Sequence, residues 1–145
     1  MKSDPSIKTI VVASIRRHSM DMDTWVRTRF WDEGDLILKQ ELSSICEIAA
    51  DELPILYTYV DHANWTLITA RRVWRSSDGM VASVAASDVA EHSAGNFKGY
   101  GGQKSEIMLI RARNGEIHTC PFETGKPSMG AIYAVRTLCN LVRAT

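Results

Sequence analysis

Two dipeptides in the second half of the chain, Asp78-Gly79 and Asn114-Gly115, constrain the fold more than any other feature of the sequence. Each lies between two apolar runs, and both central residues of a type I′ turn require a positive φ that Gly, Asn and Asp tolerate best. The sequence therefore predicts a β-hairpin at each dipeptide. The Asp78-Gly79 hairpin can close with a two-residue or a four-residue loop, and the pattern leaves both open.

Apolar alternation sets the expected register of the second hairpin. With a two-residue loop at Asn114-Gly115, Ala112 lies opposite Ile117 on the next strand. Successive side chains of a strand point to opposite faces, so this register keeps the apolar side chains of both strands together. The expected buried face consists of Met108, Ile110, Ala112 and Ile117.

Three further strands are expected before this hairpin. Residues 55–60, 65–75 and 80–86 are rich in β-branched and aromatic side chains, which is typical of strands. Residues 61–64 and 76–79 separate them with the polar and small side chains of turns. The sequence predicts residues 65–75 as one uninterrupted strand.

The clearest helix of the first half is expected over about residues 35–52. Asp35 can accept a hydrogen bond from the first turn as an N-cap. Pro54 forces the residue before it out of the helical region, so the helix should stop by about Glu52. Its apolar stripe has helical spacing and consists of Leu38, Leu42, Ile45, Cys46 and Ala49.

Two segments nearer the N-terminus are less determined by their patterns. Residues 7–15 carry apolar side chains that fit a helical stripe, but their β-branched character also suits a strand. The pattern leaves helix and strand open there. Residues 25–31 alternate apolar and polar positions, which favours a short strand.

Length, charge and cysteine content limit the class of protein. The chain has 145 residues, the size of a single domain. Lys plus Arg and Asp plus Glu are 17 each, and this balance removes the bulk electrostatic attraction on which nucleic-acid binding mainly rests. The three cysteines, an odd number far apart, and an N-terminus without a long apolar run favour a soluble cytoplasmic protein.

The order of the elements resembles that of pleckstrin-homology-like (PH-like) domains, in which strands are followed by one C-terminal helix. Such a helix is expected after Pro127, with Ser128 as its N-cap. Its apolar stripe consists of Met129, Ile132, Val135, Cys139 and Val142. The segment Trp65-Thr66-Leu67-Ile68-Thr69-Ala70-Arg71-Arg72-Val73-Trp74 is similar to a strand of the GRAM and bacterial PH-like families, and the likeness covers about residues 55–142.

The resemblance implies a small curved antiparallel sheet capped by the C-terminal helix, a scaffold that mostly binds lipids, peptides or proteins. The chain departs from it in two places: some 50 N-terminal residues lie outside the usual unit, and residues 95–102 form an unusual insertion. We therefore expect one α+β domain over residues 1–145. Residues 1–54 would be an N-terminal extension with the helix, and residues 55–142 the PH-like sheet and its helix.

The sequence contains no recognisable catalytic, metal or cofactor motif. His118 and Cys120 are two residues apart, but a structural zinc site needs two closely spaced pairs, so we expect a surface histidine and a buried cysteine. The cysteines occupy apolar-patterned positions where a thiol stays protonated and inert. A histidine–glutamate pair formed through the fold, such as His118 with Glu123, stays open. Otherwise we expect no enzyme, no metal and no cofactor.

Two segments contain the candidate partner-binding residues. Residues 95–104 form a glycine-rich loop without a nucleotide-binding pattern, and its aromatic and cationic side chains are types that anchor protein interfaces. Residues 71–75 form a second basic and aromatic cluster. The candidates are Phe97, Lys98, Tyr100, Lys104, Arg71 and Arg72.

These features favour a non-catalytic module that binds another protein. One version is an immunity protein that neutralises a cognate bacterial toxin by covering it. The alternative is a PH-like module that binds an anionic lipid or a phosphorylated ligand, which would need more clustered cations than the sequence offers. An uncharacterised enzyme is the third hypothesis, and nucleic acid is not an expected partner.

Overall fold

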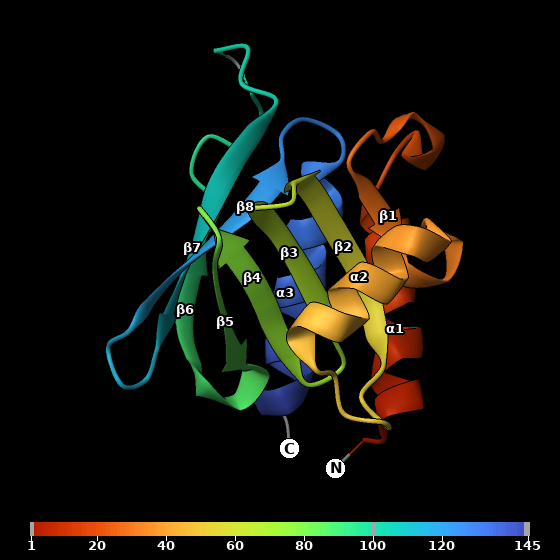
Figure 1. Ribbon diagram of the computed structural model, residues 1–145, viewed down its shortest axis with the longest axis vertical. Helices are drawn as coiled ribbons and strands as arrows, with labels where there is room; N and C mark the ends of the chain where they lie inside the picture. Colours follow the sequence, from red (N-terminus) through yellow and green to blue (C-terminus); the bar gives the residue numbers. More distant parts are fainter. Residues whose placement is uncertain (1, 100, 144–145) are drawn as a thin grey trace.

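The computed structural model describes residues 2–99 and 101–143 of the chain, arranged as Figure 1 shows. In this part of the chain there are three α-helices and two antiparallel sheets, which confirms the α+β class. The helices are α1 (Asp4–His18), α2 (Leu36–Cys46) and α3 (Ser128–Arg143).

Both sheets are open, and their strands follow one another in chain order. The five-stranded sheet consists of β1 (Thr28–Phe30), β2 (Pro54–Asp61), β3 (Asn64–Thr69), β4 (Arg72–Ser77) and β5 (Met80–Ala85). The three-stranded sheet consists of β6 (Val89–Ser93), β7 (Ser105–Ala112) and β8 (Ile117–Glu123). Short 3₁₀ turns lie at Met22–Thr24, Trp31–Glu33 and Ala86–Asp88.

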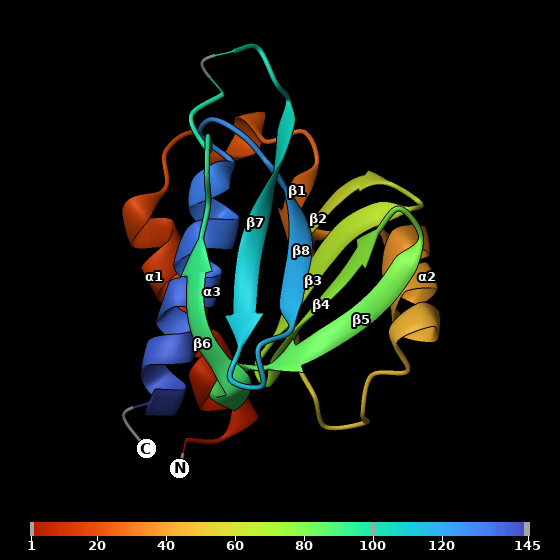
Figure 2. The ribbon, with the colours of Figure 1, turned by 90° about the vertical axis from the view of Figure 1, so that its left-hand side faces the viewer.

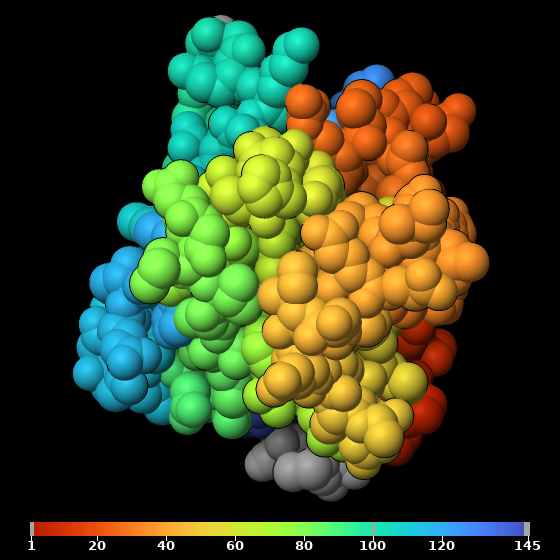
Figure 3. Space-filling view, viewed as in Figure 1, coloured from red at the N-terminus to blue at the C-terminus, as the bar shows by residue number. Residues whose placement is uncertain are grey.

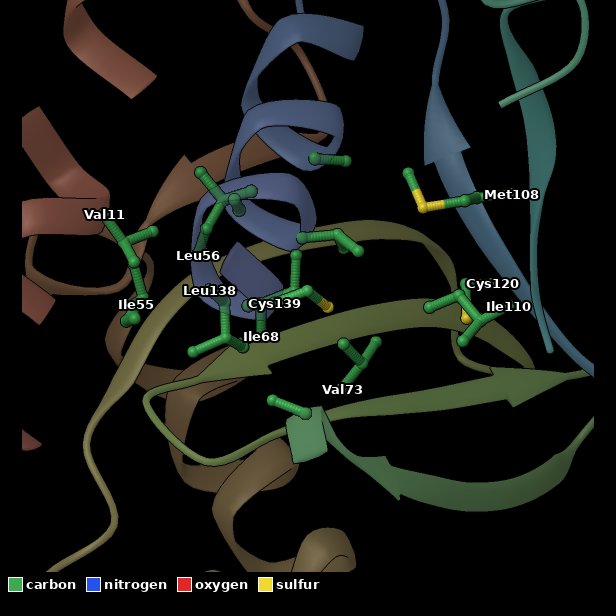
Figure 4. Packing of buried hydrophobic residues seen from close by; sticks show 14 of the residues in the cluster. Val11, Ile55, Leu56, Ile68, Val73, Met108, Ile110, Cys120, Leu138 and Cys139 are labelled. Carbon is green, nitrogen blue, oxygen red and sulfur yellow. The ribbon is translucent and has the colours of Figure 1, made fainter. Parts of the chain in front are cut away.

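The five-stranded sheet lies between two layers of helix. On one face α1 and α3 lie side by side, as Figure 2 shows, and together with the three-stranded sheet they enclose the main core. Figure 4 shows side chains of this core converging from α1, α3 and both sheets, among them Val11, Ile68, Ile110 and Leu138. On the other face α2 covers β2 and β3, and Leu42 and Cys46 belong to a second, smaller core there (Figures 1 and 3).

The N-terminal segment that the sequence left undecided is helix α1. The Ser3 hydroxyl caps it by accepting a hydrogen bond from the Ser6 N–H at 3.3 Å, and Pro5 occupies the first turn, where proline is tolerated. Its buried residues are Ile7, Val11, Ser14 and Ile15, a helical stripe that faces α3 and the sheet. Packing of this stripe in the main core therefore favours a helix over a strand for this segment.

Helix α2 begins as expected and ends earlier. The Asp35 carboxylate accepts a hydrogen bond from the Leu38 N–H at 2.8 Å, which confirms the N-cap. The helix stops at Cys46, because Glu47 adopts a left-handed conformation with φ 50°. The expected end near Glu52 is therefore wrong.

The segment expected as one strand over residues 65–75 is two strands, β3 and β4, joined by a tight turn at Ala70 and Arg71. The Thr69 hydroxyl makes this turn, because its oxygen accepts hydrogen bonds from the N–H groups of Arg71 and Arg72, each at 3.1 Å. Threonine hydroxyls can replace a backbone partner in this way. The sequence shows no Gly, Pro or Asn at this turn to mark it.

The first predicted hairpin is confirmed, and its loop has two residues. Ser77 pairs with Met80, and the central residues Asp78 and Gly79 have φ values of 50° and 84°. These are the positive values that a type I′ turn requires.

The first strand and the last helix are of the predicted type, and they differ from the predictions in where they begin or end. The short strand expected within residues 25–31 is β1, and Trp31 already belongs to the following 3₁₀ turn. The last helix is α3, in which Ser128 is the first residue rather than the residue before it, and its hydroxyl donates to the Gly125 carbonyl. Val135 and Cys139 of the expected stripe are buried, whereas Met129, Ile132 and Val142 are half-buried.

Candidate functional site

The hairpin between β7 and β8 closes with three loop residues rather than two. The Ala112 N–H donates to the Glu116 carbonyl at 2.8 Å, which leaves residues 113–115 as the loop. Of the expected turn dipeptide, only Gly115 has a positive φ, 92°. The Asn114 side chain instead accepts a hydrogen bond from the Glu116 N–H at 3.0 Å.

The expected register is therefore wrong by one residue. Arg111, not Ala112, lies opposite Ile117, and Ile110 lies opposite His118. A shift of one residue moves every side chain of a strand to the other face. Ile117 is consequently on the outer face and 53% exposed, while His118 is on the inner face and only 5% exposed. The expectation of a surface histidine is wrong for this reason.

The outer face of β7 and β8 carries three exposed aliphatic side chains. Ile107, Leu109 and Ile117 are 41%, 45% and 53% exposed. Arg111 shares this face and pairs with Glu91 of β6 at 2.8 Å, so the two charges compensate each other. We call Ile107, Leu109 and Ile117 the apolar face, and Figure 2 shows the strands that carry it side by side.

Of the predicted loop, the structure describes residues 95–99 and 101–104, which precede β7 and project from the molecule (Figure 3). Phe97, the expected anchor, is half-buried and packs against the main core, and its carbonyl accepts the Gly125 N–H at 2.7 Å. The Lys98 ammonium lies 6.0 Å from the centre of the Phe97 ring. Lys98 and Lys104 are exposed, and Tyr100 lies outside the described residues.

Arg71 and Arg72 lie far from this loop, because the β3–β4 turn is at the opposite end of the molecule in Figure 1. Arg71 pairs with Asp4 and with Asp51, each at 2.8 Å. Arg72 pairs with Glu52 at 3.3 Å, and its guanidinium lies 5.3 Å from the centre of the Trp74 ring. The six predicted partner-binding residues therefore do not form one surface.

The buried carboxylate of Glu52 contacts several side chains at the end of the sheet beside Arg72. It accepts hydrogen bonds from the Thr69 hydroxyl at 2.7 Å and from the Trp74 indole N–H at 3.1 Å. Thr69 is the residue that makes the β3–β4 turn, so this cluster holds that turn in place. The two arginines at this turn thus have structural partners.

His118 lines a cleft of about 260 Å³ between β5 and the β7–β8 hairpin. The other polar side chains of the cleft are Ser83, Asp88, Arg113, Asn114 and Glu116. Burial lowers the pKa of His118, the nearby Arg75 charge lowers it further, and Glu116 acts in the opposite direction. The imidazole is therefore neutral at pH 7, and the sequence could not reveal this cleft because the expected register placed His118 outside.

The histidine–glutamate pair that stayed open in the sequence is not formed. His118 Nε2 lies 3.7 Å from a carboxylate oxygen of Glu116. Glu123 is buried elsewhere and accepts hydrogen bonds from two N–H groups and a hydroxyl of the segment entering β1.

The three cysteines are buried, as expected from their apolar positions. Burial, with a smaller effect of Glu52, raises the pKa of the Cys46 thiol to about 12. Burial also raises the pKa of Cys120 to about 12, and it raises that of Cys139. Within the described residues, no three His, Cys, Asp or Glu side chains are grouped so that they could hold a metal ion. None of the helices in residues 2–99 and 101–143 is long and apolar enough to span a membrane.

Comparisons of the chain with protein-family models, curated proteins and solved structures found no match.

Proposed function

We propose that this protein is a non-catalytic module that binds another protein through the apolar face. The observation that carries the proposal is the exposure of Ile107, Leu109 and Ile117 on neighbouring strands. Removing such side chains from water against a partner contributes about 25 cal/mol per Å² of apolar surface, which opposes the entropic cost of association. The adjoining loop, with Lys98 and Lys104, supplies a polar rim of the kind that surrounds protein interfaces.

A protein partner fits this surface better than an anionic membrane. Arg111 is compensated by Glu91 on the apolar face, and Arg71 and Arg72 are compensated by carboxylates at the far end of the molecule. Membrane attraction needs several cations near one surface, each contributing about 1 kcal/mol. The high thiol pKa values also support a function without covalent catalysis.

The likeness to PH-like domains is part of this proposal. The order of the elements, two antiparallel sheets followed by a C-terminal helix, supports this likeness. The contact between the two sheets also supports it, because the Thr66 hydroxyl of β3 donates to the Pro121 carbonyl of β8 at 2.6 Å. The packing of α1 against α3 is a departure from it. An immunity protein that covers a toxin domain is the narrower version of the function.

The test has two steps, identification of a partner and measurement of its affinity. A protein recovered by the purified chain from its native host would be produced separately, and its Kd measured against Ile107→Ser, Leu109→Ser and Ile117→Ser together. The expected result is a Kd raised by about tenfold or more, since truncated interface anchors commonly cost this much.

The matched control is Leu36→Ser with Ile37→Ser, two exposed aliphatic residues of α2 outside the apolar face. The control should leave the Kd unchanged, and both variants should unfold at the temperature of the unchanged protein. An equal loss of affinity in the control, or no loss in the apolar-face variant, would contradict the proposal. Protection of cells from a recovered toxin would test the narrower version.

A further inference from the structure

Strand β5 forms an open edge of the five-stranded sheet. It is the last strand in the order of that sheet, and it pairs with β4 along its whole length. The hydrogen bond from the Ala86 N–H to the Arg71 carbonyl, at 2.9 Å, continues this ladder and marks one of its bonded pairs. Bonded and non-bonded pairs alternate between antiparallel strands, so Met80, Ala82 and Val84 point their backbone groups toward β4.

The backbone groups of the intervening residues point away from the sheet. They are the N–H and C=O groups of Val81 and Ser83 and the N–H group of Ala85. Among the hydrogen bonds of residues 2–99 and 101–143, none reaches these groups. A row of unpaired N–H and C=O groups on an edge strand is a template for pairing with another extended chain.

The sequence of β5 lacks the features that usually protect an edge strand. Natural edge strands are often blocked by charged side chains, by proline or by a bulge. β5 contains no charged residue and no proline, and its register with β4 has no bulge. The edge of the other sheet differs, because the Arg143 guanidinium of α3 donates to the carbonyls of Val89 and Ala90 of β6 at 3.4 and 3.3 Å.

The cleft of about 260 Å³ between β5 and the β7–β8 hairpin borders this edge, and its lining includes Ser83, Val84 and Ala85. Successive side chains of a strand point to opposite faces, so a cleft that reaches all three residues lies at the edge of β5 rather than on one face. At the start of the strand Met80 and Val81 are 72% and 43% exposed. Figure 1 shows β5 at the margin of its sheet.

We propose that the open edge of β5 binds an extended segment of another protein, which adds a strand to the five-stranded sheet. An extended backbone presents alternating donors and acceptors that match those of Val81, Ser83 and Ala85, and strand addition is a general mode of peptide recognition. The hairpin across the cleft leaves space for a single chain rather than for a second folded sheet. This inference goes beyond the proposed function and does not rest on the apolar face.

The experiment follows backbone amide hydrogen exchange in the full chain by NMR. The probe is the peptide acetyl-Lys-Val-Thr-Val-Thr-Val-Lys-amide, whose β-branched residues favour an extended conformation. The matched control is the same peptide with N-methyl groups on its five inner residues, because these remove the N–H donors that strand pairing needs. Without peptide, Val81, Ser83 and Ala85 should exchange faster than Met80 and the other residues bonded to β4.

The probe should slow exchange at Val81, Ser83 and Ala85 in a saturable way, by about tenfold or more, since these amides gain partners. Exchange at Ala82 and Val84 should change little, because their amides already bond to β4. The N-methylated peptide should leave all of these rates unchanged.

Substitution with proline tests the same edge from the side of the protein. Ser83→Pro removes an outward N–H and keeps the ladder to β4, and proline is tolerated in this position of an edge strand. It should weaken probe binding by about fivefold or more, as the loss of one hydrogen bond does. Ser83→Ala keeps the N–H and should bind as the unchanged protein does. Val81→Pro with Val81→Thr is a second pair, used if Ser83→Pro lowers the unfolding temperature.

Four outcomes would overturn the inference. They are the absence of saturable protection, equal binding of the N-methylated peptide, equal binding by both proline variants, and protection of the edge that rises with protein concentration without any peptide. The last would identify a second copy of the chain as the occupant, and sedimentation would show the dimer. The triple variant of Ile107, Leu109 and Ile117 should still bind the probe, so a failure at β5 is distinguishable from a failure of the apolar face.

Discussion

At the scale of single residues, Glu123 shows how one buried carboxylate positions a short strand. It accepts hydrogen bonds from the Val26 N–H at 3.1 Å, the Arg27 N–H at 2.9 Å and the Thr28 hydroxyl at 2.8 Å. β1 has only three residues, and Thr28 also bonds to Thr58 of β2. Glu123 therefore links β8 to the edge of the five-stranded sheet.

Replacing Glu123 with Ala should lower the free energy of unfolding by about 3 kcal/mol, because three partly or fully buried donors lose a charged acceptor. Urea denaturation measures this difference. Glu41→Ala, at an exposed position of α2, is the control and should change the stability by about 0.5 kcal/mol or less. A similar effect of both substitutions would contradict the role assigned to Glu123.

His118 and His92 should make the stability depend on pH below neutrality. Burial is the main cause that lowers both pKa values, aided by Arg75 at His118 and by Arg143 and Arg136 at His92. The unfolded chain then binds protons at its ordinary histidine pKa, about 6.5, before the folded chain does. Stability should be full above that pH and should fall as the pH drops through it toward the lowered folded values.

Urea denaturation from pH 8 to pH 5 measures this slope. Relative to its own maximum, His118→Gln should lose less stability over the range than the unchanged protein. His62→Gln, at an exposed position, should retain the full slope. If the slope is the same in all three proteins, His118 does not contribute to the pH dependence of the stability.

At the scale of elements, the β7–β8 hairpin offers a direct test of register. In the observed register Ala112 is buried and Ile117 is exposed, whereas a two-residue loop would bury both. Ile117→Lys should therefore change the free energy of unfolding by about 0.5 kcal/mol or less, as exposed substitutions usually do. Ala112→Lys should destabilise by about 3 kcal/mol or more, because it places an unpaired charge in the main core. Large destabilisation by Ile117→Lys would contradict the observed register and would support a two-residue loop.

At the scale of the whole molecule, residues 1–54 contribute to the same cores as the rest of the chain. Val11 and Ile15 of α1 are fully buried against α3 and the sheet, and the hydroxyls of Ser14 and Thr137 are hydrogen-bonded at 2.7 Å. Leu42 and Cys46 of α2 cover the opposite face of the sheet. Each layer of helix depends on this N-terminal third.

A fragment of residues 55–145 should therefore fail to fold, because it would expose the faces that α1, β1 and α2 cover. Its NMR spectrum should lack dispersion, and it should show no cooperative unfolding in urea. The full chain should unfold in one transition, as single domains of this size usually do. A folded fragment would show instead that residues 1–54 are an extension of an autonomous unit.

Local interactions account for the parts of the fold that the sequence predicts. The Asp78–Gly79 turn requires positive φ at two adjacent residues, and the start of α2 requires a cap at Asp35. Each depends on atoms a few residues apart, so the residue types alone indicate it. The same holds for the C-terminal helix and for the apolar positions of the three cysteines.

Which side chains the candidate site exposes is decided only when the layers of the fold pack together. Ile107, Met108, Leu109 and Ile110 are all apolar, so either face of β7 could be buried. Packing against α3 selects Met108 and Ile110, and the three-residue loop then turns His118 inward and Ile117 outward. The sequence by itself determined that a hairpin forms around Gly115. Tertiary packing decided which side chains it buries, because strand periodicity leaves a one-residue shift open until one face finds its core.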